Sequence, residues 1–391
     1  MITIDASAAV HNKAGLTRYG EELIRALSAD PAHRSEYAVF YHDSATARPS
    51  ALIQSLPGVS TAQTARPWRL RALLAQLVNL SQDELLAGIP RPADQRGADI
   101  FHATEHLLPR FKRIRTVFTV HDLIFRFFPQ HHLPLNRAFL TLGFPLFLRR
   151  ADAIICVSEQ SRRDTQRLYR VPDAKIRVIA EGVHPRFRRV TDAVALQRAR
   201  ERYHLPARFI LAVGTIEPRK NLATLFRAYA ELMREGRGQG AEEELQLVVT
   251  GRQGWMVEHT MRAVHELGLT GLVHFTGFVA DEDLPALYSL AGAFAFPSVY
   301  EGFGLPPLEA LACGAPVVCS DASSLPEVTG DAALLVPPLD VRGWMLALGR
   351  VLSDVDLRRD LAQRGPRQAA RFTWPETARQ TRAVYDELMR A

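Results

Sequence analysis

Two glutamates stand out as candidate ligand-binding residues in the stretch FPSVYEGFGLPPLEALACGAPVVCSD, residues 296–321. Glu301 lies in a glycine-containing turn, and Glu309 lies eight positions later, inside a helix predicted to begin near Gly304. A helix start of this kind presents N–H donors and positive potential to a phosphate. Carboxylates at these two places can accept hydrogen bonds from sugar and ribose hydroxyls. Taken singly, a capping glutamate and a surface glutamate explain the positions better, but the combined pattern favours a binding site.

A basic pair forms a second candidate site in LAVGTIEPRKNLATL, residues 211–225. A predicted strand ends at Gly214, and Arg219 and Lys220 stand just before a helix whose predicted N-cap is Asn221. A guanidinium and an ammonium beside a helix start match the oxygens of a diphosphate. Two solvent-facing basic residues are the alternative interpretation.

Candidate residues also lie in the first half of the chain. His121 and Asp122 follow a predicted strand in TVFTVHDLIF, and Gly15 opens a predicted helix in HNKAGLTRYGEELI. The carboxyl end of a strand is the functional edge of a parallel sheet, where a histidine can donate to a sugar hydroxyl or a backbone carbonyl. A structural histidine and an ordinary helix-start glycine remain equally simple explanations of these positions.

The second half of the chain supplies the elements that would position the two sites there. Short apolar runs occur at RFILAVG (208–214), LQLVVTG (245–251), LVHFTGF (272–278), AFAFPS (293–298), PVVCSD (316–321) and ALLVPP (333–338). Between the first two, residues 221–236 carry apolar side chains three and four positions apart, as in an amphipathic helix. This alternation predicts right-handed crossovers and a parallel sheet that is covered on both faces.

The first half repeats the pattern less regularly. Strands are predicted at MITIDAS, EYAVFYH, GADIFHA, RTVFTVHD and ADAIICVS, and helices at 16–29, 134–150 and 159–169. The polar segment 185–206 contains no strand and is the predicted linker. We therefore predict an α/β fold with two doubly wound parallel sheets in series, which places ligands at the carboxyl ends of the strands.

The two glutamates, with seven residues between them around GFGLPPLEALACGAPVV, resemble the motif of the retaining family 4 glycosyltransferases, which have the GT-B fold. The resemblance covers nearly the whole chain. It implies two Rossmann-like domains facing a cleft, with an acceptor-side domain over residues 1–190 and a donor-side domain over 191–372. It further implies a C-terminal helix, 373–391, that packs back toward the first domain.

The resemblance also implies a role for each candidate residue. Glu301 would lie by the donor sugar and Glu309 would hold the nucleotide ribose, while Arg219 and Lys220 would hold the diphosphate. Many relatives carry an arginine directly after the glycine that ends the strand, where this chain has Thr215. By the same resemblance His121 would be the active-site histidine, and the further donor-binding residues would be Gly15, Asp122, Gly214, Thr215, Val279, Ser298, Gly302, Phe303, Gly304 and Leu305.

The activity implied by this resemblance is transfer of a hexose from a nucleotide-diphosphate sugar to a glycan or lipid-linked saccharide, with retention of configuration. Mannose from GDP-mannose, used in surface polysaccharide synthesis, is the leading expectation. No cofactor, metal or nucleic acid is expected. Asp281-Glu282-Asp283 imitates a metal-binding D-x-D motif, but it directly precedes a predicted helix, and the acidic residues are expected to cap it.

Composition places the chain among ordinary globular proteins. It has 391 residues, 47% of them hydrophobic, and three cysteines, a sparse odd number that favours reduced thiols in the cytoplasm. Residues 1–190 hold 27 Lys and Arg against 17 Asp and Glu, whereas the rest hold 21 against 25. Such a basic half suggests an anionic partner, although scattered surface arginine explains it equally well.

Two basic and apolar clusters, residues 66–80 (RPWRLRALLAQLVNL) and 108–115 (LPRFKRIR), are compatible with peripheral contact with an anionic membrane. They are equally compatible with a core helix whose arginines are solvated. The apolar run 138–148 is too short to span a bilayer and contains a proline, so no membrane crossing is expected.

Two other classes of function stay open at the level of the sequence. A sugar-nucleotide epimerase of similar architecture would need acid-base carboxylates and no acceptor site. A non-catalytic nucleotide-sugar binding protein would be expected to lack one of the key charges, and His121, Arg219, Lys220, Glu301 and Glu309 are all present.

Overall fold

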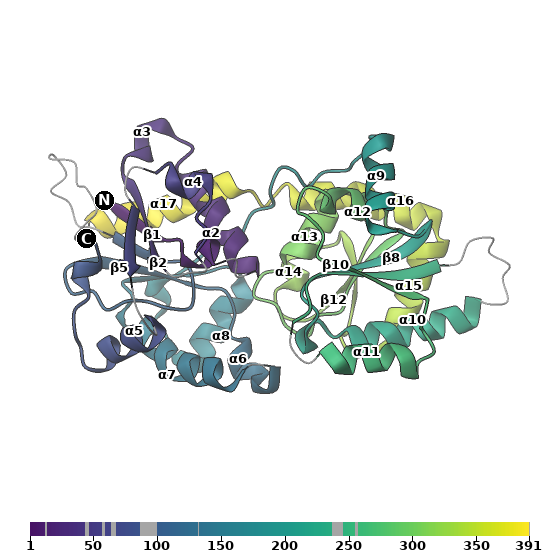
Figure 1. Ribbon diagram of the computed structural model, residues 1–391, viewed down its shortest axis with the longest axis horizontal. Helices are drawn as coiled ribbons and strands as arrows, with labels where there is room; N and C mark the ends of the chain where they lie inside the picture. The colour runs from purple at the N-terminus through teal and green to yellow at the C-terminus, as the bar shows by residue number, and fades with distance from the viewer. Residues whose placement is uncertain are drawn as a thin grey trace. The chain divides into compact units, whose positions relative to one another are not determined.

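The computed structural model describes residues 1–11, 14–43, 47–56, 59–63, 68–86, 100–131, 133–236, 245–254 and 257–390. The chain forms two compact units (Figure 1), each built around one sheet. Unit 1 comprises Met1–Gly182 and Thr373–Ala391, and unit 2 comprises Val183–Phe372. All strand pairs in both sheets are parallel, and helices follow the strands, so the predicted α/β class is confirmed.

Unit 1 contains a sheet of seven strands in the order β3-β2-β1-β4-β5-β6-β7. The strands are β1 Ile2–Asp5, β2 Tyr37–Asp43, β3 Val59–Gln63, β4 Ile100–Ala103, β5 Arg115–Val120, β6 Ala153–Cys156 and β7 Ile176–Val178. The α-helices are α1 Ser7–Val10, α2 Ala14–Leu27, α3 Pro31–Arg34, α4 Ala51–Gln54, α5 Trp68–Leu77, α6 Ile124–Phe127, α7 Pro134–Arg150, α8 Glu159–Tyr169 and α17 Trp374–Arg390. Short 3-10 turns lie at Asp83–Leu86, Pro129–His131 and Asp173–Lys175.

Two strands of this sheet are not among those predicted. They are β3, with the polar sequence VSTAQ, and β7, with three residues, and both lie at the edges of the sheet. An edge strand is covered less than a central one and is often short, so it need not carry an apolar run. The five predicted strands are confirmed as β1, β2, β4, β5 and β6.

Unit 2 contains a sheet of six strands in the order β10-β9-β8-β11-β12-β13. The strands are β8 Arg208–Val213, β9 Leu245–Thr250, β10 Val273–Gly277, β11 Ala293–Phe296, β12 Val317–Ser320 and β13 Ala333–Val336. The α-helices are α9 Ala193–Tyr203, α10 Leu222–Gly236, α11 Val257–Glu266, α12 Leu284–Leu290, α13 Leu305–Ala312, α14 Leu325–Thr329, α15 Val341–Ser353 and α16 Val355–Ala369, with a 3-10 turn at Pro218–Lys220. All six predicted strands are confirmed.

Helices cover both sheets, and the apolar side chains predicted to lie on one face of a helix are buried against the sheet of unit 2. The predicted amphipathic helix is α10, whose Leu225, Phe226 and Tyr229 are fully buried in the unit 2 core, where Trp344 of α15 also lies. Burying a side chain of this size contributes about 1.5–3 kcal/mol. These helices hold the strands in register, and therefore fix the loops that leave their carboxyl ends.

The last helix, α17, belongs to unit 1 although the whole of unit 2 precedes it in the chain. Its Tyr385 hydroxyl lies 2.6 Å from His102 Nδ1 in β4, and its Trp374 ring contacts Tyr19 of α2. Gly182 permits this return, because a Cβ there would lie 2.2 Å from the backbone nitrogen of Trp374. No helix in the described part of the chain is long and apolar enough to cross a membrane.

Candidate active site

The loop that follows β11 is shaped by a glycine and by two serines from the next crossover. Gly304, at the start of α13, has φ +119°, and a Cβ there would lie 2.8 Å from the Leu325 side chain. The Glu301 N–H donates to the Ser323 hydroxyl at 2.8 Å, and the Ser324 hydroxyl donates to the Phe303 carbonyl at 2.6 Å. The backbone of residues 301–304 is therefore held in place before any ligand binds.

Glu301 is buried in the described structure and accepts hydrogen bonds from three side chains. Its Oε1 lies 2.7 Å from Lys220 Nζ and 2.7 Å from Ser298 Oγ, and its Oε2 pairs with the Arg219 guanidinium. Burial alone would raise its pKa, but the charges of Arg219 and Lys220 outweigh burial and lower the pKa to about 2. The carboxylate is thus ionised at any physiological pH.

Arg219 and Lys220, the predicted diphosphate-binding pair, both meet this carboxylate. Arg219 also donates from Nε to Glu217 Oε1 at 2.8 Å, so it lies between two carboxylates. Lys220 Nζ lies 4.6 Å from the centre of the Phe296 ring. Gly214 leaves room for the lysine stem, because a Cβ there would lie 3.1 Å from Lys220 Cε. Two cations and two carboxylates therefore form one balanced cluster.

The environment of Lys220 leaves some of its hydrogen-bonding capacity for a ligand. Burial and the neighbouring Arg219 lower its pKa, while Glu301 acts in the opposite direction. An ammonium has three N–H donors, and Glu301 Oε1 is its one hydrogen-bond acceptor among the described residues. A diphosphate oxygen can therefore be added without breaking the ion pair.

Glu309, the other predicted glutamate, lies in α13 and accepts from a tyrosine of α12. It is buried in α13, with 1% of its surface exposed, and its Oε2 accepts from the Tyr288 hydroxyl of α12 at 3.1 Å. The helix begins where it was predicted, with Gly304 at its N-cap, but Pro306 and Pro307 occupy its first turn and have no N–H. The helix start therefore offers fewer N–H donors to an anion than an ordinary helix would.

Other predicted donor residues of unit 2 occupy the carboxyl edge of its sheet. Thr215 follows Gly214 directly after β8, and the buried Val279 follows β10. Beside Val279, the Phe278 ring is 58% exposed and is covered by the Arg252 guanidinium, 4.7 Å from the ring centre. An exposed aromatic ring of this kind can stack on a nucleobase.

In unit 1, His121 stands at the carboxyl end of β5, as predicted. Its Nε2 lies 2.9 Å from the Thr104 carbonyl oxygen, and because a carbonyl only accepts, Nε2 carries the proton. Its Nδ1 lies 3.4 Å from Glu181 Oε1, and the ring meets Tyr19 edge-on. Thr104 and Glu181 follow β4 and β7, so three strands of one sheet hold the imidazole.

The remaining unit 1 residues start helices. Asp122 Oδ1 accepts from the Ile124 N–H at 3.2 Å and thereby supports the first turn of α6. Gly15 is exposed near the start of α2, and a Cβ there would meet no atom of the described protein within 4 Å. Packing therefore does not require a glycine at this position, whereas close approach of a ligand to the backbone would.

Several residues of the site were missed from the sequence or were given another role. Glu217, Glu181, Ser323 and Ser324 each support a predicted residue. The available signal was their position just after a strand or before a helix. Asn221 is more than a cap: its amide donates to the carbonyls of Pro297 and Pro338, which ties the start of α10 to two neighbouring loops.

The expectation that acidic residues cap α12 is wrong in its detail. Asp283 occupies the N-cap position, but its side chain makes no capping hydrogen bond. Its buried carboxylate instead accepts from Arg202 at 2.9 Å and from the Tyr203 hydroxyl at 2.8 Å, both in α9. Asp283 therefore links α9 to the start of α12 within unit 2.

Comparison with protein families gives one match in each half of the chain. Residues 14–187 match the family described as Glycosyltransferase Family 4, and residues 196–368 match Glycosyl transferases group 1. The chain is 32% identical to the O-antigen chain mannosyltransferase B of Escherichia coli over 379 residues, 95% of each protein. It is 35% identical over 269 residues to the serotype-specific mannosyltransferase WbdA of Escherichia coli, covering 68% of this chain and 32% of WbdA.

Solved structures resemble the whole chain in fold. A sucrose-phosphate synthase from Thermosynechococcus elongatus matches with a TM-score of 0.72 and 23% identity, covering 99% of this chain and 98% of that one. HepE of Anabaena, in complex with UDP-glucose, matches with a TM-score of 0.72 and 19% identity over 99% of both chains. These two likenesses show the two-sheet fold.

Proposed function

The chain belongs to family 4 of the glycosyltransferases, with the GT-B fold, and we propose that it transfers mannose from GDP-mannose to a growing surface polysaccharide with retention of configuration. The observation that carries this proposal is the match to a polysaccharide mannosyltransferase over 95% of both chains. The acceptor is a glycan or lipid-linked saccharide.

The charged cluster of unit 2 supports a transfer in which the nucleoside diphosphate leaves. As the bond to the sugar breaks, negative charge develops on the diphosphate, and Arg219 and Lys220 stabilise it together with the loop N–H groups. Ser298 and the two cations hold Glu301 in place, so its carboxylate keeps one position beside the sugar. Because the cations are already ordered by carboxylates, little reorganisation is needed at the moment of reaction.

His121 has a supporting role toward the sugar in this proposal. Its tautomer is set by Thr104 and its plane by Glu181 and Tyr19. A donor hydroxyl would exchange with one of these contacts. We assign no covalent nucleophile, and propose that the departing diphosphate oxygen assists the acceptor hydroxyl on the same face of the sugar, without a metal.

We place the reaction in the cytoplasm, with peripheral contact to the inner face of the membrane where a lipid-linked acceptor would lie. The support for the cytoplasm is that the three cysteines are free and buried. Support for the membrane contact is the excess of cationic residues in the first half of the chain.

The test is a transfer assay with the full chain, a mannose-containing acceptor and either GDP-mannose or UDP-glucose, each with and without EDTA. We expect transfer from GDP-mannose alone, unchanged by EDTA, and an α-linked product by NMR. Transfer only from UDP-glucose would refute GDP-mannose as the donor, and a product of inverted anomeric configuration would refute the retaining mechanism. Epimerised donor in a reaction without acceptor would favour an epimerase instead.

A binding measurement separates loss of catalysis from loss of the site. A ligand at 100 times its dissociation constant adds about 2.7 kcal/mol of stability, so GDP should raise the melting temperature of the chain. If no nucleoside diphosphate does so, the donor site has been misassigned. Binding without transfer to any acceptor would favour a non-catalytic nucleotide-sugar binding protein.

A further inference from the structure

Unit 1 contains a polar cavity of about 330 Å³ at the opposite end of the strands from His121. Residues 108–116 line it just before and at the amino end of β5, and Arg150 and Asp152 line it just before β6. Since β5 has six residues at about 3.3 Å each, the cavity lies roughly 17 Å along the strand from its carboxyl end. It is therefore separate from the candidate active site.

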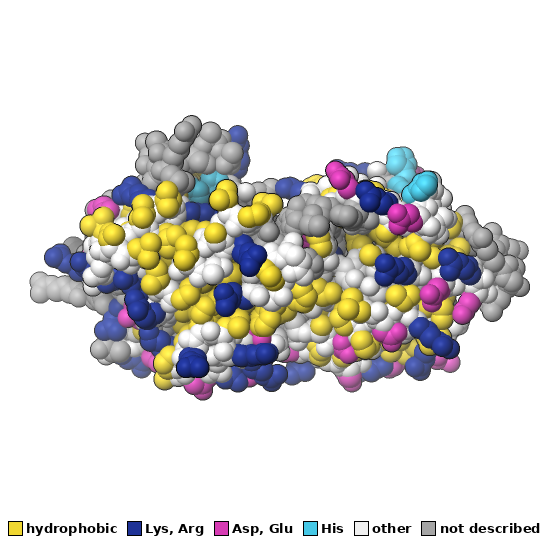
Figure 2. Space-filling model, turned by 90° about the horizontal axis from the view of Figure 1, so that it is seen from below, with side chains coloured by type: hydrophobic (Ala, Val, Ile, Leu, Met, Phe, Trp, Pro, Cys, Tyr) yellow, Lys and Arg dark blue, Asp and Glu magenta, His cyan; other side chains and the backbone are white. Residues whose placement is uncertain are grey.

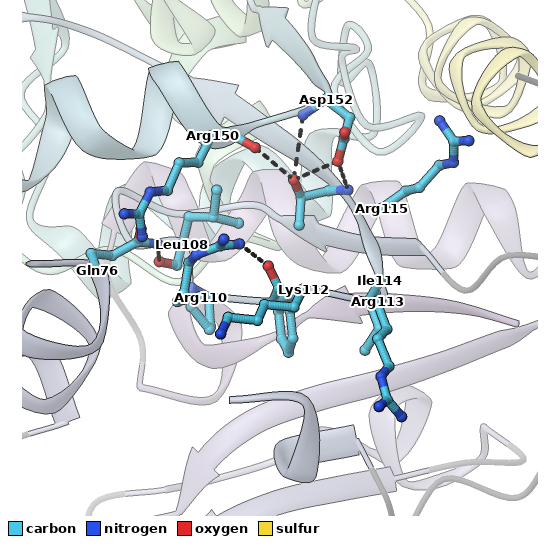
Figure 3. Close-up of a pocket in the computed structure, with 12 residues that line it drawn as sticks. Gln76, Leu108, Arg110, Lys112, Arg113, Ile114, Arg115, Arg150 and Asp152 are labelled. Carbon is cyan, nitrogen blue, oxygen red and sulfur yellow. Dashed lines mark hydrogen bonds between the residues drawn. The ribbon is translucent and has the colours of Figure 1, made fainter. Parts of the chain in front are cut away.

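The cavity is strongly basic. Five cationic side chains line it, from Arg110, Lys112, Arg113, Arg115 and Arg150, against one carboxylate, Asp152. In Figure 3 Arg110, Lys112 and Arg150 lie together, while Arg113 and Arg115 extend away from them. Among the described residues none of the five cationic groups forms an ion pair, although the Asp83 carboxylate accepts from the Lys112 backbone N–H at 3.0 Å.

The one carboxylate does not neutralise these cations. Asp152 Oδ2 accepts from the Thr116 N–H at 2.7 Å and from its hydroxyl at 3.0 Å, as the dashed lines in Figure 3 show. Burial of the Arg150 guanidinium, together with the charges of Arg110 and Arg149, lowers its pKa. A bound anion would relieve this repulsion.

Neutral side chains hold the two arginines in place. Arg150 donates to Gln76 Oε1 at 2.8 Å, and the Gln76 amide donates to the Leu108 carbonyl at 2.8 Å. Arg110 Nε donates to Asn79 Oδ1 at 3.0 Å. The guanidinium groups are thus ordered without losing charge, which is the arrangement that favours a phosphate.

The residues that hold the arginines alternate with exposed apolar ones. Gln76 lies between Leu74 and Leu77 in α5, which are 49% and 57% exposed. Asn79 lies between Val78 and Leu80, which are 69% and 63% exposed. Because Leu70, Leu74 and Leu77 share one face of the helix, α5 turns an apolar surface away from the core.

The face of unit 1 that carries α5 and α7 is both apolar and basic. Both helices lie on the lower side of unit 1 in Figure 1, and in the view from below the unit 1 half shows broad yellow areas with more dark-blue than magenta side chains (Figure 2). Exposed leucines of and beside α7, Leu135 and Leu142 among them, extend the apolar surface. A soluble phosphate would need the cations alone, whereas the phosphate of a bilayer lipid also explains the leucines.

We propose that the basic cavity of unit 1 binds the phosphate group of an anionic membrane lipid, while the apolar face of α5 enters the acyl boundary. The inference rests on the proposed function only in that a lipid-linked acceptor brings the enzyme to the membrane. It assigns that contact to one cavity and one helix face, defined by Arg110, Arg150, Leu74 and Leu77.

The test is flotation of the full chain with vesicles of phosphatidylcholine, with or without phosphatidylglycerol. We expect binding only to the anionic vesicles, and a loss of about 10- to 30-fold in affinity for Arg110→Gln/Arg150→Gln. The matched control is Arg227→Gln/Arg262→Gln, which removes the same charge from exposed positions of α10 and α11 in unit 2. Equal losses in both double variants would overturn the cavity as the site.

A second variant tests the apolar face, and a soluble anion tests the source of the phosphate. Leu74→Gln/Leu77→Gln should weaken vesicle binding about 10-fold or more without changing the charge. Unchanged vesicle binding would overturn the role of α5. If inorganic phosphate at micromolar concentration saturates the cavity and vesicles do not bind, the site serves a soluble phosphate and the proposal fails.

Activity on a water-soluble acceptor keeps this proposal separate from the proposed function. All of these variants lie outside the candidate active site, so transfer to a soluble acceptor should remain at the wild-type rate. Loss of that transfer in the folded cavity variants, with vesicle binding intact, would overturn the separation of the two sites. An inactive wild-type chain that still binds anionic vesicles would refute the enzyme assignment alone.

Discussion

The functional edge of unit 2 carries a cluster of paired opposite charges, whereas in unit 1 the hydrogen bonds of the buried His102 join neutral groups. In unit 2, Arg219 and Lys220 meet Glu217 and Glu301. In unit 1, His102 lies 2.7 Å from Thr119 and 2.6 Å from Tyr385, and burial lowers its pKa to about 3. Two sheets of similar topology thus carry different chemistry.

The difference follows from what each edge must hold. An ordered set of opposite charges can exchange or share partners with an anionic diphosphate at little cost of reorganisation. Burial lowers the pKa of His102 and so keeps it uncharged, and neutral hydrogen-bonding groups of this kind do not attract competing anions. The comparison therefore predicts that charge changes matter most in unit 2, and that protonation matters most in unit 1.

The largest effect is expected from Glu301→Gln, which leaves the partly buried Arg219 and Lys220 with less compensation. Breaking a buried ion pair from one side costs about 3–5 kcal/mol, and kcat should fall at least about 100-fold, or about 2.7 kcal/mol. Steady-state rates and thermal unfolding measure both effects. The control is Glu282→Gln, at an exposed position. Wild-type kcat in folded Glu301→Gln would show that this carboxylate does not act on the reaction.

The second largest effect is expected from acidification, which should lower the stability of the two units at different pH values. The folded pKa of His102, about 3, lies below its ordinary value of 6.5, so between these values the unfolded chain binds more protons. The stability that neutral His102 contributes is complete above pH 6.5 and is lost as the pH falls toward 3. For Glu301 the corresponding pKa values are 4.5 and about 2, so its contribution is lost only below pH 4.5.

Unit 1 should therefore open before unit 2 as the pH falls, which hydrogen exchange followed by peptide can measure. The change in the pKa of His102 corresponds to a contribution on the order of 5 kcal/mol to the free energy of unfolding. His102→Gln should flatten the stability of unit 1 between pH 6.5 and 3, while His265→Gln, at an exposed position, should not. Earlier opening of unit 2 would contradict the comparison.

A strand, helix or contact of this protein can be predicted from the sequence where the residues that determine it are close together in the chain. The six strands of unit 2 and the amphipathic helix α10 follow from the local apolar pattern, because the apolar side chains in that pattern are the ones that the fold buries. The short polar strands β3 and β7 do not, since only their partners in the sheet make them strands. Likewise, the pairing of Glu301 with Arg219 joins residues 82 positions apart.

The site shows the same division between position and partner. The sequence places Glu301, Glu309, Arg219, Lys220 and His121 at the ends of strands or in the following helix, where the structure has them. Their partners Glu181 and Ser324 come from other loops, whereas Glu217 lies only two positions before Arg219. Asp283 illustrates the opposite error. Its N-cap position predicts a hydrogen bond from the backbone of α12 to its carboxylate, but the carboxylate accepts from Arg202 and Tyr203 instead.

A third effect, of intermediate size, concerns the two cations. Lys220→Ala and Arg219→Ala each remove a charge-assisted contact to the diphosphate, worth about 1.5–3 kcal/mol. Calorimetry with GDP should therefore show an affinity about 10- to 150-fold lower. Arg227→Ala, exposed in α10 and outside the cluster, is the control. Unchanged GDP affinity in both variants would place the diphosphate elsewhere.

The fourth prediction separates the two glutamates. Glu309→Gln should raise the donor KM and weaken GDP about 10-fold, because the ribose does not change during the reaction. Glu301→Gln should leave GDP affinity equal or higher, since it frees the cations from a carboxylate. Tyr288→Phe removes the hydroxyl that donates to Glu309 and should give a smaller change of the same kind. If Glu301→Gln weakens GDP as much as Glu309→Gln does, the assignment of the pair is wrong.

The smallest effect on stability is expected from Gly15→Ala, so its effect on donor binding can be measured in a folded protein. An alanine Cβ there would meet no described atom within 4 Å, and alanine favours a helix over glycine by about 0.5–1 kcal/mol. Gly15→Ala should therefore keep or slightly raise the melting temperature. If the backbone of α2 approaches the donor phosphate, the added methyl group should raise the donor KM several-fold.

Gly236→Ala provides the matched control for this change. Gly236 is also exposed in a helix, at the end of α10, and a Cβ there also meets nothing within 4 Å. Both variants should gain similar stability, but only Gly15→Ala should change the donor KM. An unchanged KM in both would mean that unit 1 contacts the donor through side chains such as His121 and not through this backbone. Because neither variant disturbs packing, the difference between them isolates the ligand's approach to unit 1.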